Sequence, residues 1–218
     1  MEYRAIIWDL DGTLLDTLQD LTASVNAALL AHGCPCRTRE EVRRFVGNGV
    51  EKHMRRAMPE GDTAVDFDRL FFDFRAHYAG HCNDATAPYP GIMEALKELK
   101  QQGVPMAVVS NKLDPAVKAL CETHFGNLIG VAIGECEGVR RKPAPDSVLR
   151  AMELLGSTDA VYIGDSEVDI ATAKNAGLPC ICVGWGFRSE AALRAAGAEQ
   201  IALDVEALME LLNRRSDA

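Results

Sequence analysis

The sequence has no long apolar run. No stretch approaches the roughly 20 residues that a helix needs to span a bilayer. The N-terminus has no basic stretch followed by an apolar segment, so a secretory signal is not expected. Cationic residues are the minority, with 23 Lys and Arg against 32 Asp and Glu and a formal net charge of −9. Phosphate backbones are held mainly by clustered Lys and Arg, so a nucleic-acid binder is not expected either. We expect a soluble cytoplasmic protein.

Cysteine provides no framework. The 218 residues contain seven Cys, an odd number, with no pair-of-pairs spacing of the zinc-ribbon kind. A disulfide scaffold is therefore not expected. Apolar residues, by contrast, make up 48% of the chain, which is ample for one large domain or for a core with a smaller insert.

Short apolar, β-branched runs recur along the chain, as is typical of buried parallel strands. The runs are Ala5–Trp8, Met106–Val109, Val131–Ile133, Ala160–Ile163 and Cys180–Val183. Segments with apolar spacing near 3.6 separate the later runs and indicate helices. This alternation predicts an α/β fold with a doubly wound, Rossmann-like parallel sheet.

Helix boundary signals agree with the alternation. Asp114 is expected as an N-cap with Pro115 at the first helical position, and Pro145 fits the first position of the next helix. Gly156 and Gly177 stand where glycines end helices.

One interval, from about Thr17 to Asp84, has helical periodicity and no convincing strand. Thr17 and Asp20 resemble a capping box at its start. Further helices are expected over 40–46, 50–58 and 64–82. We expect a small helical cap domain, 15–84, inserted after the first strand of a catalytic core formed by 1–14 and 85–218.

Polar side chains follow four of the five predicted strands, at the edge where open parallel sheets bind ligands. After the first strand come Asp9, Asp11 and Gly12. The period of two puts both carboxylates on one side, close enough to share a divalent cation and act on one phosphorus. A second carboxylate can give and take protons, and Gly12 lets the backbone approach a phosphate. Taken alone, these residues fit a plain turn equally well.

The loops after the second and third strands supply hydrogen-bond donors and a cation. Ser110 and Asn111 could donate to phosphoryl oxygens. Lys142, shortly before Pro145, could be aimed inward as a compact charge that neutralises Asp9. Ordinary loop chemistry would explain each of them separately.

Asp165 and Asp169 follow the fourth strand. Asp165 can ligate Mg²⁺, and Asp169 can join it or lie behind it. The ordinary reading is a helix cap formed by Asp165 or Ser166. If these residues had no catalytic role, all four of the ordinary structural explanations would have to apply at once along one edge of the sheet.

In this order, D-L-D-G-T-L-L-D, Ser110-Asn111, Lys142 in K-P-x-P and G-D-S-x-x-D resemble the four-motif signature of the haloacid dehalogenase superfamily. The resemblance extends over essentially the whole chain, and the helical insert matches the family's cap. It implies a nucleophile that is transiently phosphorylated and a bound Mg²⁺ ion. The implied roles are Asp9 as nucleophile, Asp11 as general acid and base, Ser110 as phosphate binder, Lys142 as charge stabiliser, and Asp9, Asp165, the Asp11 carbonyl and Asp169 as metal ligands.

Two branches of the superfamily fit poorly. Its dehalogenases lack the carboxylate two residues after the nucleophile, which this chain has as Asp11. Its phosphonatases have another residue in place of Gly12 and take a Schiff-base lysine from the cap. Lys52, the only cap lysine, lies in no context that singles it out.

Three further segments most resemble phosphoglycolate phosphatases: Phe45–Val50, Tyr89–Gly91 and Gly184–Phe187. Within the first, Gly47 and Asn48 could present backbone amides to a substrate carboxylate. A tight helix-to-helix turn explains them equally well.

We therefore expect a Mg²⁺-dependent phosphatase acting through an aspartyl-phosphate on 2-phosphoglycolate or a similar small phosphorylated metabolite. A pyrophosphatase, a sugar-phosphate phosphatase or a phosphomutase of the same superfamily stays an alternative, as does a non-catalytic binding or regulatory protein on this fold. A monomer and a homodimer both stay open.

Overall fold

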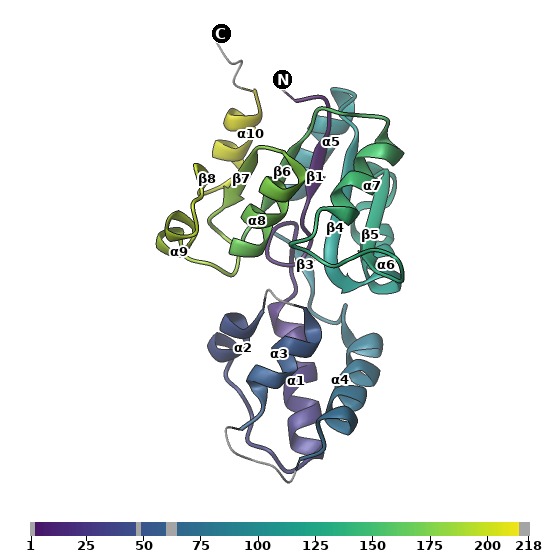
Figure 1. The fold of residues 1–218 in the computed structure, drawn as a ribbon, viewed down its shortest axis with the longest axis vertical. Helices are drawn as coiled ribbons and strands as arrows, with labels where there is room; N and C mark the ends of the chain where they lie inside the picture. The colour runs from purple at the N-terminus through teal and green to yellow at the C-terminus, as the bar shows by residue number, and fades with distance from the viewer. Residues whose placement is uncertain (1–2, 47–48, 60–64, 214–218) are drawn as a thin grey trace. The chain divides into compact units, whose positions relative to one another are not determined.

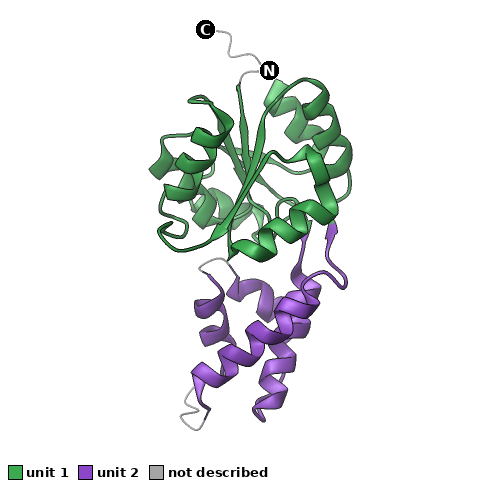
Figure 2. Ribbon diagram, turned by 90° about the vertical axis from the view of Figure 1, so that its right-hand side faces the viewer, with its two compact units in different colours: residues 1–15, 88–218 green, residues 16–87 purple. Residues whose placement is uncertain are grey.

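The computed structural model describes residues 3–46, 49–59 and 65–213. The chain divides into two compact units, 1–15 with 88–218 and 16–87 (Figure 2). Gly47 and Asn48, expected near a substrate carboxylate, lie outside the described residues. Within the described ranges, no helix is both long and apolar enough to cross a membrane.

The larger unit is built on a six-stranded sheet with the strand order β5-β4-β1-β6-β7-β8, in which every neighbouring pair is parallel (Figure 1). The strands are β1 (Ile6–Trp8), β4 (Met106–Leu113), β5 (Val131–Glu135), β6 (Val161–Gly164), β7 (Cys180–Val183) and β8 (Gln200–Ala202). In the centre, Ile7 of β1 lies opposite Ala107 and Tyr162. The predicted fold class is confirmed.

Helices cover both faces of this sheet (Figure 1). The helical segments of this unit are α5 (Ile92–Gln101), α6 (Asp114–Phe125), the 3₁₀ turn η1 (Gly126–Leu128), α7 (Asp146–Leu155), α8 (Glu167–Ala176), α9 (Glu190–Ala195) and α10 (Val205–Asn213). Successive β1 side chains enter different cores, as strand geometry requires. Ile6 and Trp8 pack in the cluster that includes α5, α6 and α10, and Ile7 packs in the cluster that includes α7 and α8. Burial on both faces explains the continuous apolar runs.

The smaller unit is helical. Its helices are α1 (Leu18–Ala31), α2 (Arg39–Phe45), α3 (Val50–Ala57) and α4 (Phe67–His81). Helix α1 lies against α4, and the two bury Leu21, Val25, Leu70 and Phe74. Two short strands at the ends of the insert, β2 (Leu15–Asp16) and β3 (Ala87–Pro88), form a two-stranded sheet.

The capping box expected at the start of α1 is wrong. Thr17 is the N-cap residue, but its side chain accepts no capping hydrogen bond. Asp20 instead accepts hydrogen bonds from both backbone amides and the hydroxyl of the 85–86 segment. A capping box does form at α2, between Thr38 and Glu41. The Asp20 carboxylate therefore binds a segment that is distant in the sequence, and the local capping box does not form.

Two proline positions are displaced by one residue from those expected. Strand β4 runs through Leu113 directly into α6, so Asp114 is the first helical residue and Pro115 the second. The carbonyl of Pro145 accepts the first hydrogen bond of α7, which makes Pro145 the N-cap residue. The sheet also continues beyond the last predicted strand, with β8 and then α10.

Candidate active site

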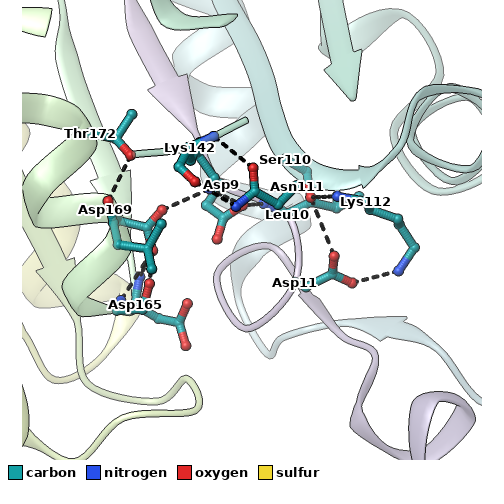
Figure 3. Close-up of polar contacts among 12 residues, drawn as sticks. Asp9, Leu10, Asp11, Ser110, Asn111, Lys112, Lys142, Asp165, Asp169 and Thr172 are labelled. Atoms are coloured by element: carbon teal, nitrogen blue, oxygen red, sulfur yellow. Dashed lines mark hydrogen bonds and ion pairs between the residues drawn. The ribbon is translucent and has the colours of Figure 1, made fainter. Parts of the chain in front are cut away.

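Lys142 lies between two carboxylates at the carboxyl edge of the sheet (Figure 3). Its Nζ is 2.8 Å from Asp9 Oδ1 and 2.8 Å from Asp169 Oδ1. Asp9 directly follows β1, and Lys142 comes from the loop before α7. Each of the three residues is at most 7% exposed. Because buried charges are costly unless paired, this arrangement specifies the position of the ammonium.

Both carboxylate oxygens of Asp169 accept hydrogen bonds. Oδ1 accepts from Lys142 Nζ at 2.8 Å and from the Tyr162 hydroxyl at 2.9 Å. Oδ2 accepts from Ser166 Oγ at 2.6 Å and from the amides of Asp165 and Ser166. Burial alone would raise the pKa of Asp169, but the charge and hydrogen bonds of Lys142 hold it below its usual value. Asp169 is thus an ionised anchor for Lys142 and for the start of α8.

Negative charge is in excess around Asp9 and Asp165. Ligand oxygens of Asp9, Asp165 and Asp169 all lie within 4.8 Å of one another. Burial, and then repulsion from Asp169, raises the pKa of Asp9 to about 7, although Lys142 opposes the shift. Burial and repulsion from Asp169 and Asp9 raise the pKa of Asp165 well above its usual value. Such a cluster needs protons or a further cation to be stable.

The backbone packs tightly around Asp165. The amide of Phe187 donates to Asp165 Oδ2 at 2.6 Å. A Cβ atom on Gly12 or on Gly186 would overlap the Asp165 side chain, and Gly12 has a φ of +88°. The N–H of Gly12 donates to the Leu15 carbonyl, so the visible role of this glycine is close packing. A phosphate contact from Gly12 stays a prediction.

Asp11 is held in a separate ion pair, with a lysine that the sequence analysis missed. Lys112 Nζ is 2.7 Å from Asp11 Oδ1, and Ser110 Oγ donates to Asp11 Oδ2 at 3.4 Å. Figure 3 shows Asp11 turned toward Lys112, apart from Asp165 and Asp169. The signal for Lys112 was a charged residue at the end of an apolar strand. Its partner, 101 positions away, gave no local signal.

Asn111 anchors the backbone of Lys142. Its side-chain amide donates to the Lys142 carbonyl at 3.1 Å, and its side-chain oxygen accepts from the Lys142 amide at 2.8 Å. This residue of β4 thereby fixes the loop that carries the central cation. Phosphate binding by Asn111 stays a prediction.

Comparison with known proteins shows relatives of the whole chain. A phosphoglycolate phosphatase of Pseudomonas putida is 34% identical over 217 residues, covering 94% of this chain and 78% of that protein. One from Rhodobacter capsulatus is 36% identical over 192 residues, covering 84% and 85%. The crystal structure of a Lactobacillus delbrueckii subsp. bulgaricus protein assigned as a phosphoglycolate phosphatase superposes with a TM-score of 0.92 at 39% identity, covering 97% of this chain and 99% of that one.

The match also holds at the level of the family. The sequence model of the family described as haloacid dehalogenase-like hydrolase matches residues 6–183, a span that runs from β1 to β7 and includes every strand-end motif. The chain therefore belongs to the haloacid dehalogenase-like hydrolases and is a phosphatase of their phosphoglycolate phosphatase-like branch.

Proposed function

We propose that this phosphatase is Mg²⁺-dependent, uses Asp9 as its nucleophile, and acts on 2-phosphoglycolate or a closely similar small phosphorylated metabolite. The observation that carries the proposal is the buried Lys142, which contacts Asp9 and Asp169 at the carboxyl edge of the sheet. A carboxylate can attack a phosphate dianion only where positive charge offsets the repulsion. The substrate is taken from the curated relatives, whose names specify phosphoglycolate.

The carboxylate cluster fits Mg²⁺, because it offers only oxygen ligands and carries excess negative charge. Both carboxylate oxygens of Asp169 already accept hydrogen bonds. Asp9 and Asp165, together with the Asp11 carbonyl, are therefore the better candidates for metal ligands. Direct ligation by Asp169 stays a prediction. When bound, Mg²⁺ would polarise a phosphoryl oxygen and neutralise charge.

The reaction proceeds in two displacements. Asp9 attacks the phosphorus in line, the ester bond breaks, and Asp11 gives its proton to the leaving alkoxide. Asp11, now a carboxylate, takes a proton from water, which attacks the phosphorus and releases phosphate from Asp9. Lys142 stabilises the charge in both steps, and the Ser110 hydroxyl, which donates to Asp11 Oδ2 in this structure, would donate to a phosphoryl oxygen once Asp11 moves. Asp11 must leave its contact with Lys112 and take up a proton from solvent before it can act as the acid.

The helical unit would serve as the cap. Residues 16–87 form a compact unit of their own, which two linkers join to the core. Closure of such a unit would exclude bulk water from the aspartyl-phosphate, and reopening would release product. In this proposal the linkers near 14–17 and 83–90 are the hinge. A substrate-carboxylate contact from Gly47 and Asn48 stays a prediction.

The direct test is phosphate release from a panel containing 2-phosphoglycolate, pyrophosphate and sugar phosphates, with Mg²⁺ and with a chelator. We expect Mg²⁺-dependent release with a preference for 2-phosphoglycolate, and none from a folded Asp9→Asn variant. A preference for another compound of the panel would be consistent with the proposed mechanism but would exclude 2-phosphoglycolate as the preferred substrate. An active, well-folded Asp9→Asn protein would exclude Asp9 as the nucleophile.

A further inference from the structure

Lys112 is a buried cation that the reaction described above does not use. It lies near the end of β4, its side chain is 5% exposed, and its Nζ is 2.7 Å from Asp11 Oδ1. Lysine is almost never buried without a charged partner. Asp11, at 19% side-chain exposure, is the more accessible member of the pair, so it can move away while Lys112 stays.

The charge balance of the site explains why a second lysine is needed. Among the described residues, Lys142 pairs with Asp9 and Asp169, Lys112 pairs with Asp11, and the charge of Arg188 acts on Asp165. Lys142 is committed to Asp9 and Asp169 and serves the phosphoryl group. A substrate with a further anionic group would be repelled by these carboxylates unless a separate cation received that group.

In the proposed reaction, the role of Asp11 as the acid would bring the leaving group near Lys112, the ion-pair partner of Asp11. A general acid must come within hydrogen-bond distance of the ester oxygen that it protonates. In 2-phosphoglycolate only one methylene group separates that oxygen from the carboxylate. A cation in contact with the acid therefore lies within reach of a carboxylate in this position.

We propose that Lys112 binds the carboxylate of the leaving group and selects substrates that bear an anionic group next to the phosphate ester. The inference rests on the proposed function and identifies the residue that recognises the substrate carboxylate. The substrate carboxylate replaces Asp11 as the ion-pair partner of Lys112. Asp11 is thereby released to the ester oxygen when a substrate of the right charge is bound.

The test compares 2-phosphoglycolate with ethyl phosphate, which carries a methyl group in place of the carboxylate. For each enzyme, kcat/KM is measured with both substrates in Mg²⁺, and the ratio is the readout. We expect the wild-type ratio to favour 2-phosphoglycolate and to fall at least tenfold in Lys112→Met, chiefly through KM, because a hydrogen bond to a charged group is worth about 1.5–3 kcal/mol. Lys112→Arg should recover part of the ratio.

A matched control is Lys118→Met, since Lys118 is an exposed lysine on the adjacent helix α6 that pairs with Asp114. Its ratio should equal that of the wild type. An unchanged ratio in Lys112→Met, an equal loss for both substrates, or a wild-type enzyme without preference would overturn the inference and leave the phosphatase assignment intact. If Lys112→Met does not fold, Lys112→Gln is judged by the same ratio. Absence of hydrolysis of any phosphomonoester by the wild type would instead refute the proposed function.

Discussion

At the scale of single residues, the site is organised by charge compensation. Lys142 is in contact with Asp9 and Asp169, and none of the three has appreciable access to water. Removing one member of such a group leaves the others as uncompensated buried charges. We therefore expect the ammonium to be needed for the fold of this sheet edge and, in the proposed mechanism, for the reaction.

Lys142→Met should abolish phosphatase activity and lower the free energy of unfolding by about 3–5 kcal/mol, because two buried carboxylates lose their counter-charge. Urea unfolding followed by circular dichroism measures the stability change. The exposed Lys97→Met is the control and should change stability by less than about 0.5 kcal/mol. Equal urea midpoints for Lys142→Met and the wild type would contradict this account of the site.

The sequence predicts Asp9, Lys142 and Asp165 as neighbours, because parallel strands place their carboxyl ends at one edge and each residue follows a strand or precedes a helix. It does not predict that Lys112 pairs with Asp11 or that the Phe187 amide binds Asp165. Both contacts depend on how distant loops are placed. No periodicity within one segment encodes that placement.

At the scale of elements, α3 contains an unusual buried histidine. His53 is 3% exposed, and its Nε2 atom has no hydrogen-bond partner among the residues that the structure describes. Burial, with a smaller contribution from the charge of Arg56, lowers its pKa to about 4 from 6.5. Burial in the helical unit therefore disfavours the protonated form of His53.

This depressed pKa predicts that stability falls as the pH is lowered. Between pH 6.5 and about 4 the unfolded chain binds the proton and the folded chain does not, so the full stability is present only above pH 6.5. The loss reaches about 3 kcal/mol near pH 4. Urea unfolding at several pH values should show this slope reduced in His53→Leu and retained in His81→Leu, where the histidine is exposed. The same slope in His53→Leu and the wild type would disprove the explanation.

Asp20 joins the start of α1 to the segment that leaves the helical unit. Its buried carboxylate accepts hydrogen bonds from the amides of Ala85 and Thr86 and from the Thr86 hydroxyl. We expect Asp20→Ala to destabilise the protein by about 2–4 kcal/mol in urea unfolding, since buried donors lose their acceptor. The exposed Asp68→Ala should have little effect. A comparably small change for Asp20→Ala would show that the contact carries little stability.

Helices and strands were predicted well where apolar periodicity was strong, and poorly where contacts between distant segments determine the local structure. The helices of the insert were found within a few residues. The capping box expected at Thr17 does not form, because the Asp20 carboxylate accepts a hydrogen bond from the distant Thr86 amide instead. Strand β8 was missed because it has only three residues, with a polar residue, Gln200, at its start.

At the scale of the whole molecule, the fold and family follow from the order of motifs along an alternating chain, and both are confirmed. The substrate did not follow, since specificity depends on spatial relations between side chains, and the ion pair between Lys112 and Asp11 shows that such relations join residues far apart in the sequence. The motifs are shared by the superfamily, whereas such contacts differ between its members.

The excess negative charge at the site predicts that Mg²⁺ stabilises the folded protein. A cation that binds only the folded state adds about 2.7 kcal/mol at a concentration 100 times its Kd. Thermal unfolding should show Tm rising with Mg²⁺ relative to a chelator, and the rise should be lost in Asp165→Asn. A rise of equal size in Asp165→Asn would place the cation elsewhere.

The central claim is that Asp9 becomes phosphorylated, and the most direct measurement is mass spectrometry of the trapped intermediate. Asp11→Asn should be loaded with p-nitrophenyl phosphate, whose leaving group needs no proton, so that the first displacement proceeds while the second lacks its base. After acid quenching and peptide mapping, we expect one equivalent of p-nitrophenol and a phosphoryl group on Asp9. One equivalent of p-nitrophenol with Asp9 unmodified, or a phosphoryl group on any other residue, would contradict the account.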